Sequence, residues 1–423
     1  MQQRSLKRLQ WSTFLSATLG YGMYYVCRLS LNVVKKPIVE EGIFSETELG
    51  IIGAVLFFTY AVGKFTNGFL ADRSNINRFM STGLLVTALV NLFLGFVHSF
   101  ILFAILWGIS GWFQSMGAAS CVVGLSRWFT DKERGSFYGF WSASHNIGEA
   151  MTFIIVASVV SAFGWRYGFL GAGLVGLIGV LVIWRFFHDS PQSKGLPAVN
   201  VPRAKKAMNA LETEEFNRAQ KSVLKNPAIW ILAFSSAFMY ISRYAINGWG
   251  VLFLQEIKGY TLAAATQVIS VNALCGIVGT VFSGWLSDAF FHGRRNVLAF
   301  GFGVLNTVAL CLFLYSGDGL VVNILSMILF GVAIGVLICF LGGLMAIDIV
   351  PREATGAALG IVGMASYVGA GLQDIVSGWL INSGKTELDG VTSYNFDSAI
   401  VFWIAASAVS FILALFVAKR SHR

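Results

Sequence analysis

The sequence contains few charged residues for its length. Only 12% of its 423 residues are charged, whereas 56% are hydrophobic. A soluble globular chain carries about 25% charged residues, so this chain could not cover a water-exposed surface of its size. The composition excludes a soluble enzyme and a nucleic-acid-binding protein. It predicts an all-α integral membrane protein embedded in a lipid bilayer.

Cysteine is also scarce, and no cysteine lies in a CxxC pair. The five cysteines all fall inside apolar stretches, where a thiol behaves as a small hydrophobic group. This pattern predicts neither a disulfide framework nor a zinc site. We therefore expect no metal and no cofactor.

Hydropathy predicts twelve membrane spans in two groups of six, because a spanning helix needs roughly 20 apolar residues. The sequence thus divides into an N-terminal six-helix half (1–187), a polar linker that is partly helical (188–226) and a C-terminal six-helix half (227–423). The expected spans are 10–33, 48–71, 79–97, 100–125, 136–162, 167–187, 228–254, 262–287, 296–316, 321–347, 354–382 and 393–418.

Lysines and arginines predict the orientation, because they concentrate on the side of the membrane that is not translocated. With a cytoplasmic N-terminus, only Lys35, Lys36, Arg166, Lys258 and Lys385 fall on the opposite face. We therefore expect both termini and the linker to be cytoplasmic. The basic start of the chain could also be a cleaved signal peptide, but no clear A-x-A site follows it.

The two predicted halves repeat short sequence motifs at an offset of about half the chain. The turn from Gly68 to Arg73 returns at Gly284 to Asp288, and the segment from Met23 to Arg28 returns at Met239 to Arg243. Many secondary transporters are built from such repeats and hold their substrate near the midplane. Glycine rows at helical spacing, Gly331 with Gly335 and Gly356 with Gly360 and Gly363, are expected to allow close helix packing.

Three cations lie inside predicted spans, where a charge costs at least about 2.5 kcal/mol. Arg28 and Arg243 occupy equivalent places in the two halves, and a pair of guanidinium groups matches a phosphate dianion. The alternative is that buried carboxylates neutralise them. Glu149 and Asp374 are the candidate charge-balancing acids, and Asp348 lies near a helix end.

The sequence leaves more than one role possible for the third cation, Lys64, and for His145. Lys64 could contact substrate, pair with Glu149 or extend toward the cytoplasmic end of its helix. His145 lies well inside a span and could donate to an anion, or it could be a packing residue.

Aromatic residues near the arginines are candidate contacts for a sugar ring, with ordinary packing as the alternative; they are Tyr21, Tyr24, Tyr25 and Tyr240. The two repeated turns contain Asp72, Arg73 and Asp288 on the predicted cytoplasmic face. We expect these three residues to act as gates that brace one end state of a transport cycle, and we do not expect them to bind substrate.

The repeated turns, the twelve spans and the central linker resemble the major facilitator superfamily. Further strings resemble its organophosphate:phosphate antiporter family, above all the bacterial hexose-phosphate transporters and the transporter-like sugar-phosphate receptors. These strings are Tyr24 to Arg28, Gly63 to Phe65, Ala71 to Asn75, Gly111 to Gln114, His145 to Gly148, Ser190 to Pro197 and Arg243 to Trp249. The glycerol-3-phosphate antiporters are more distant.

The resemblance implies exchange of a sugar phosphate, such as glucose 6-phosphate, for inorganic phosphate by a rocker-switch in a bacterial inner membrane. It places phosphate-binding arginines at Arg28 and Arg243, with His145 and Lys64 nearby, and we expect Trp249 to contact the sugar. The chain departs from the family pattern at Leu29, Gly248 and Glu149, where family members commonly carry lysine, aspartate and glycine.

A sensor of external sugar phosphate would use the same cleft and add a membrane partner, usually a histidine kinase. Glycerol 3-phosphate is the alternative substrate. No nucleophile–base pair is recognisable in the sequence, so we expect no enzyme activity.

Overall fold

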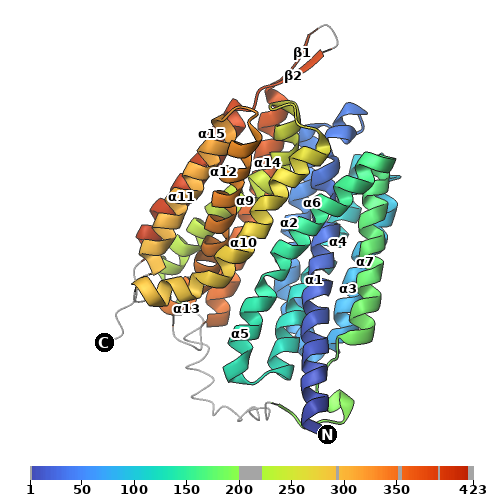
Figure 1. The fold of residues 1–423 in the computed structure, drawn as a ribbon, viewed down its shortest axis with the longest axis vertical. Coiled ribbons are helices and arrows are strands. Elements are labelled where there is room, and N and C mark those ends of the chain that lie inside the picture. Colours follow the sequence, from blue (N-terminus) through green and yellow to red (C-terminus); the bar gives the residue numbers. More distant parts are fainter. Residues whose placement is uncertain (1, 200–221, 292–294, 351–354, 389–390, 418–423) are drawn as a thin grey trace. The chain divides into compact units, whose positions relative to one another are not determined.

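The computed structural model describes residues 2–199, 222–291, 295–350, 355–388 and 391–417. Nearly all of them are helical (Figure 1). The first part of the chain forms α1 (Gln2–Glu40), α2 (Glu46–Arg73), α3 (Ile76–Leu94), α4 (Phe100–Trp128), α5 (Asp131–Ser142), α6 (Ser144–Phe163), α7 (Trp165–Phe186) and the short 3-10 helix η1 (Gln192–Lys194).

The second part has the same helical character, with one small hairpin. It forms α9 (Pro227–Glu256), α10 (Leu262–Phe291), α11 (Arg295–Tyr315), α12 (Leu320–Cys339), the π-helical turn η2 (Phe340–Leu344), α13 (Met345–Ile349), α14 (Thr355–Ser383), the strands β1 (Lys385–Leu388) and β2 (Val391–Tyr394), and α15 (Asp397–Leu415). The strands pair antiparallel, with Lys385 opposite Tyr394.

The predicted membrane-spanning architecture is confirmed. Eleven helical stretches of the described chain are long and apolar enough to cross a bilayer. The 39-residue α1 covers the first predicted span, 10–33, and it is not among these eleven, because its polar residues make it less apolar. The predicted linker lies largely at residues 200–221, outside the described part of the chain.

Helix ends are set by local capping groups. The side chains of Asn75, Ser99 and Asn226 accept hydrogen bonds from the first turns of α3, α4 and α9. Thr130 and Glu133 form a capping box that begins α5. Such side chains satisfy backbone N–H groups that have no partner within the helix, so short polar sequences define where these four helices start.

Two spans are less regular than hydropathy predicted. The fifth span breaks at Ala143 into α5 and α6, directly before His145. The tenth span passes through the π-helical turn η2, which contains Gly342 and Gly343. Irregular turns of this kind often occur at functional positions within long helices.

Residue contacts group the chain into two compact units. Unit 1 contains residues 1–34 and 59–208, and unit 2 contains residues 35–58 and 209–423. The division passes through α1 and α2, because the end of α1 and the start of α2 belong to unit 2.

Each unit has its own core. In unit 1, Tyr24, Leu84, Trp128 and Ile183 belong to one buried cluster. In unit 2, a carbon atom added at Gly331 would lie 2.2 Å from the backbone oxygen of Asn272, so α10 and α12 are packed backbone to backbone there. This result confirms the first glycine row.

In the second glycine row, Gly360 does not show the same packing. A carbon atom added at Gly360 would meet no other atom within 4 Å, so the expectation of close packing was wrong at this glycine. The hydropathy of α14 does not show which of its glycines face another helix.

Candidate functional site

The guanidinium group of Arg28 is buried in unit 1, where three side chains orient it. Its Nε atom donates to the amide oxygen of Gln114 at 2.7 Å. Its central carbon lies 4.5 Å from the ring centre of Tyr25 and 4.2 Å from that of Tyr60. Only 3% of Arg28 is exposed. The contacts define the plane of the group, and the fork formed by its two Nη atoms is the part suited to a planar pair of phosphate oxygens.

Neighbouring helices hold these groups in place. The Nε2 atom of Gln114 donates to the hydroxyl of Ser110, one turn earlier in α4, at 2.9 Å. A carbon atom added at Gly148 would lie 2.3 Å from the backbone oxygen of Gly22, so α6 contacts α1 closely. The imidazole of His145, at the start of α6, lies 6.0 Å from the ring of Tyr25.

The guanidinium group of Arg243 in unit 2 is also 3% exposed and also lies among tyrosines. Its central carbon is 5.4 Å from the ring centre of Tyr244 and 6.0 Å from that of Tyr240. Tyr240 in turn contacts Tyr367 of α14, with ring centres 5.5 Å apart. Attraction between a cation and an aromatic face reaches about 6 Å, so the rings stabilise a charge that burial alone would disfavour.

Asp374, a predicted charge-balancing acid, lies in a buried cluster of unit 2. The indole Nε1 of Trp249 donates to its Oδ1 atom at 3.1 Å. The Nζ atom of Lys35 lies 4.0 Å from the same oxygen and 3.5 Å from the centre of the Trp249 ring. A carbon atom added at Gly248 would lie 3.2 Å from Oδ1, so the glycine leaves room for the carboxylate.

The other predicted residues occupy varied environments. Tyr24 is fully buried, and its hydroxyl donates to the backbone oxygen of Met80 at 2.6 Å, as in ordinary packing. Glu149 is 1% exposed on α6, whereas the side chain of Lys64 is exposed on α2. Tyr21 packs edge-on against Tyr25, with ring centres 5.5 Å apart.

The predicted gates are only partly described. The side chains of Asp72 and Asp288 lie outside the described part of the structure, and Arg73 is exposed. Their gating role stays a prediction.

Two ion pairs that the sequence did not reveal lie at helix ends. Arg127 at the end of α4 pairs with Asp189 at 2.6 Å, and Asp189 also accepts from the first backbone N–H of α3. In unit 2, Arg295 pairs with Asp348 at 2.6 Å. The sequence placed Asp348 near a helix end, as a less central candidate to neutralise a buried arginine. The structure pairs it with Arg295, the first residue of α11.

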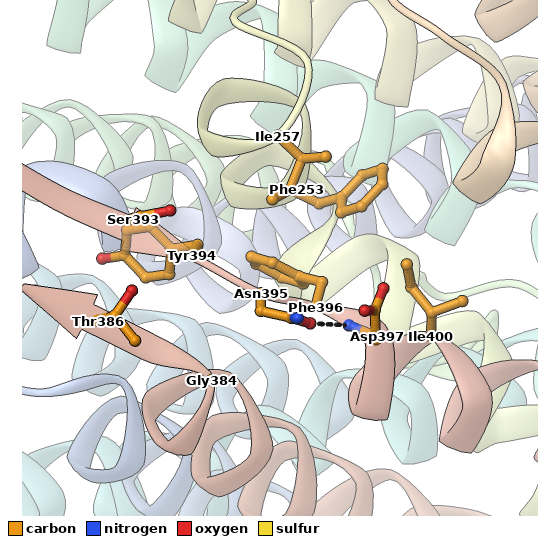
Figure 2. A pocket seen from close by; sticks show the side chains of 10 residues that line it. All are labelled: Phe253, Ile257, Gly384, Thr386, Ser393, Tyr394, Asn395, Phe396, Asp397 and Ile400. Carbon is orange, nitrogen blue, oxygen red and sulfur yellow. Dashed lines mark hydrogen bonds between the residues drawn. The ribbon is translucent and has the colours of Figure 1, made fainter.

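A pocket of about 440 Å³ lies at the base of the hairpin (Figure 2). Phe253 of α9 and Ile257, the residue after the end of α9, line one side, and Figure 2 shows the strand residues Thr386 and Ser393 on another. The Oδ1 atom of Asn395 accepts from the backbone N–H of Asp397, the first residue of α15. None of the predicted substrate residues lines this pocket, so it is separate from the candidate site.

Sequence reasoning missed Gln114, Tyr60 and Lys35. Gln114 belongs to the motif Gly111 to Gln114, which supports the family resemblance. Its polar amide lies inside a predicted span, and this position could have indicated a buried polar contact. Tyr60 lies one turn before Lys64, and the sequence alone does not show that its ring lies beside Arg28. Lys35 was counted as a residue of the opposite face, but α1 continues to Glu40 and buries it.

A chain that is nearly all helical, with many apolar helices long enough to cross a bilayer, has the architecture of a membrane transport protein. The Major Facilitator Superfamily model matches residues 14–373, and the chain belongs to this superfamily. Similar proteins include the membrane sensor protein UhpC of Escherichia coli, which is 34% identical over 86% of this chain and 83% of its own length. A probable hexose phosphate transport protein of Chlamydia pneumoniae is 35% identical over 84% and 82% of the two chains. A glycerol-3-phosphate transporter of Bacillus subtilis is 33% identical over 86% and 84%.

Solved structures support the fold. A bacterial homologue of the lysosomal transporter Spinster, in an inward-facing and unoccupied conformation, matches 99% of this chain and 100% of its own, with a TM-score of 0.77 at 17% identity. A mutant form of the nucleoside transporter NupG matches 97% of this chain and 98% of its own, with a TM-score of 0.72 at 16% identity. These comparisons confirm the family resemblance, the twelve-helix fold and the prediction that the protein is not an enzyme.

Proposed function

We propose that the protein exchanges a hexose 6-phosphate for inorganic phosphate by alternating access, with Arg28 and Arg243 as the phosphate ligands. The observation that carries this proposal is the repeated arrangement of a buried arginine among tyrosine rings, once in each unit. Two desolvated guanidinium groups supply the charge and the donor geometry that a phosphate dianion requires.

The relatives support a phosphorylated substrate. The names of two of them specify hexose phosphate and glycerol 3-phosphate, and both compounds carry a phosphate monoester. Aromatic and hydroxyl groups beside the arginines, such as Tyr25 and Tyr240, can contact a sugar ring and thereby favour the hexose phosphate. His145 and Lys64 are further candidates for contact with the phosphate.

A displacement assay tests the substrate class. Purified protein binds labelled inorganic phosphate, and unlabelled compounds compete with it. We expect glucose 6-phosphate to compete better than glycerol 3-phosphate, and neutral glucose to compete barely at all. Equal competition by the two phosphates, or stronger competition by glycerol 3-phosphate, would contradict the hexose assignment and leave the organophosphate assignment intact.

A second candidate function is sensing, because the relative UhpC is described as a membrane sensor protein. A receptor would bind external sugar phosphate in the same site and signal to a partner such as a membrane histidine kinase. Counterflow of labelled phosphate in proteoliposomes distinguishes the two functions. An exchanger gives counterflow, whereas a receptor that binds phosphate but does not complete the cycle gives none.

A further inference from the structure

One side of α7 carries a row of exposed apolar side chains that ends at an arginine. Leu174, Ile178 and Leu181 are 56%, 55% and 63% exposed. Their spacing places them on the same side of the helix as Arg185, which lies in its last turn and is also exposed. Trp184, beside Arg185, is 69% exposed. In a membrane-spanning helix such an apolar row contacts acyl chains, and the aromatic and basic residues at its end lie at the level of the lipid head groups.

Other basic side chains gather at this end of unit 1. Lys194 is exposed in η1, shortly after α7. The hydroxyl of Ser12 donates to the backbone oxygen of Phe186 at 3.0 Å, so the beginning of α1 contacts the end of α7 (Figure 1). Arg8 precedes Ser12 by one helical turn, lies on the same side of α1 and is exposed. Cations from α1, α7 and η1 therefore meet at one place.

His188 lies between two of these cations and responds to their charge. Burial and the nearby positive charges of Lys194 and Arg185 lower the pKa of His188. The next residue, Asp189, does not neutralise them, because it pairs with Arg127 at 2.6 Å and accepts from the first backbone N–H of α3. The potential around His188 is therefore positive.

The remaining acids of unit 1 do not balance this charge among the described side chains. Glu133 bonds to the hydroxyl of Thr130 in the capping box of α5, and Glu149 lies buried on α6. The side chains of Asp72 and Asp131 are outside the described part of the structure. A ligand that carries a negative charge would supply what the described acids at this end do not.

We infer that Arg8, Arg185, His188 and Lys194 form a binding site for the phosphate of an anionic phospholipid, whose acyl chains lie along the apolar row of α7. Guanidinium and ammonium groups both bind phosphate oxygens, and basic sites at the ends of membrane spans bind anionic head groups. A free phosphate would use the same cations but would gain nothing from the apolar row. Because the row leads directly to Arg185, the geometry favours a lipid.

This lipid site is separate from the candidate substrate site. Arg8 lies about 30 Å from Arg28 along α1, given the rise per residue of an α-helix. The inference therefore goes beyond the exchange proposed above and does not depend on it.

Native mass spectrometry of the detergent-purified full chain measures lipid binding, because it separates protein with no bound lipid from protein with one. The probe is dioleoyl-phosphatidylglycerol, which is anionic. Dioleoyl-phosphatidylcholine, with the same acyl chains and no net charge, is the comparison. We expect the first molecule of phosphatidylglycerol to bind at least about fivefold more tightly than phosphatidylcholine.

Arg185→Gln and Lys194→Gln should each weaken binding of phosphatidylglycerol about fivefold, the usual effect of one basic residue near an anionic lipid. Arg185→Lys should stay within about threefold of the parent, because a positive charge near the head group is retained. Lys225→Gln is the matched control: it removes one positive charge from an exposed lysine just before α9 in unit 2, and its affinity should stay within about twofold of the parent. Lys194 lies in an exposed turn, so its variant tests the site even if Arg185→Gln folds poorly.

A competition experiment distinguishes a lipid from a soluble phosphate compound. Glycerophosphoglycerol is the head group without acyl chains, and an excess of about tenfold should not displace phosphatidylglycerol. Displacement would show a site for soluble phosphate compounds and would overturn the lipid assignment.

Three other results would also overturn it. One is equal affinity for phosphatidylglycerol and phosphatidylcholine. Another is unchanged affinity for phosphatidylglycerol in both Arg185→Gln and Lys194→Gln. The third is an equal loss in Lys225→Gln, which would show that only the total charge of the protein matters. Absence of phosphate exchange would leave all of these binding results intact and would overturn the proposed function instead.

Discussion

Replacing Arg28 by alanine should abolish most phosphate binding while leaving folded protein in the membrane. The guanidinium group is 3% exposed, so its contact with a phosphate would form in a desolvated environment. Removing one partner of such a buried charge pair costs about 2 to 5 kcal/mol. That loss corresponds to a decrease in affinity of roughly 30- to 5,000-fold.

The structure also predicts that lysine will not rescue the site. Arg28→Lys keeps the charge but loses the Nε donor to Gln114 and the planar surface beside Tyr25 and Tyr60. The amide of Gln114 would then lack this donor. We expect affinity to remain at least about tenfold below that of the parent.

Equilibrium binding of labelled phosphate to purified protein provides the measurement. Arg166→Ala is a matched control in the same unit, because the Arg166 guanidinium lies beside Trp165 at the start of α7, outside the arginine site. Its affinity should stay within about twofold of the parent. If Arg28→Ala bound phosphate within about threefold of the parent, the assignment of Arg28 would be wrong.

Three further changes test other parts of the structure. Gln114→Glu should weaken phosphate binding by at least about tenfold, since a carboxylate beside Nε would compete with phosphate for the Arg28 charge; binding equal to that of the parent would contradict this contact. Asp72→Asn should slow phosphate exchange far more than it weakens binding, and an equal change in both would show that the turn contacts substrate. Burial, opposed by Asp318, lowers the pKa of Lys258 to about 8. Because the unfolded chain, with a lysine pKa of about 10.4, binds more protons above pH 8, thermal stability should rise between about pH 8 and 10. Lys258→Met should flatten this rise. A variant whose stability changes with pH in the same way as the parent's would show that Lys258 does not cause the rise.

Hydropathy predicted the spans because bilayer thickness fixes how many apolar residues a helix needs. It could not predict the break at Ala143 or the π-helical turn at Phe340, since hydropathy measures side-chain polarity and both features are changes in backbone hydrogen bonding. The hairpin was also missed, because its short polar strands have the composition of a loop.

The sequence likewise predicted the central residues of the candidate site but not their neighbours. A charge at membrane depth identified Arg28 and Arg243 without any structural information. Their neighbours depend on which helices meet, and this depends on packing between distant segments. The contact of Arg28 with Gln114, for example, joins residues 86 positions apart. The burial of Lys35 was not predicted because the first predicted span ends at residue 33, whereas α1 continues to Glu40.

The membership of residues 35–58 in unit 2 has a consequence for how the protein assembles. The contact between Glu46 and Lys385 joins residues 339 positions apart, so it cannot form until nearly the whole chain has been synthesised. Until α14 is inserted, the buried face of residues 35–58 must contact lipid or other helices. Contacts between residues so far apart in the sequence are slow to form. Expression of the chain from residue 227 onward as a separate fragment would leave Asp374 without Lys35. Such a fragment should therefore be unstable in the membrane unless residues 35–58 are supplied with it.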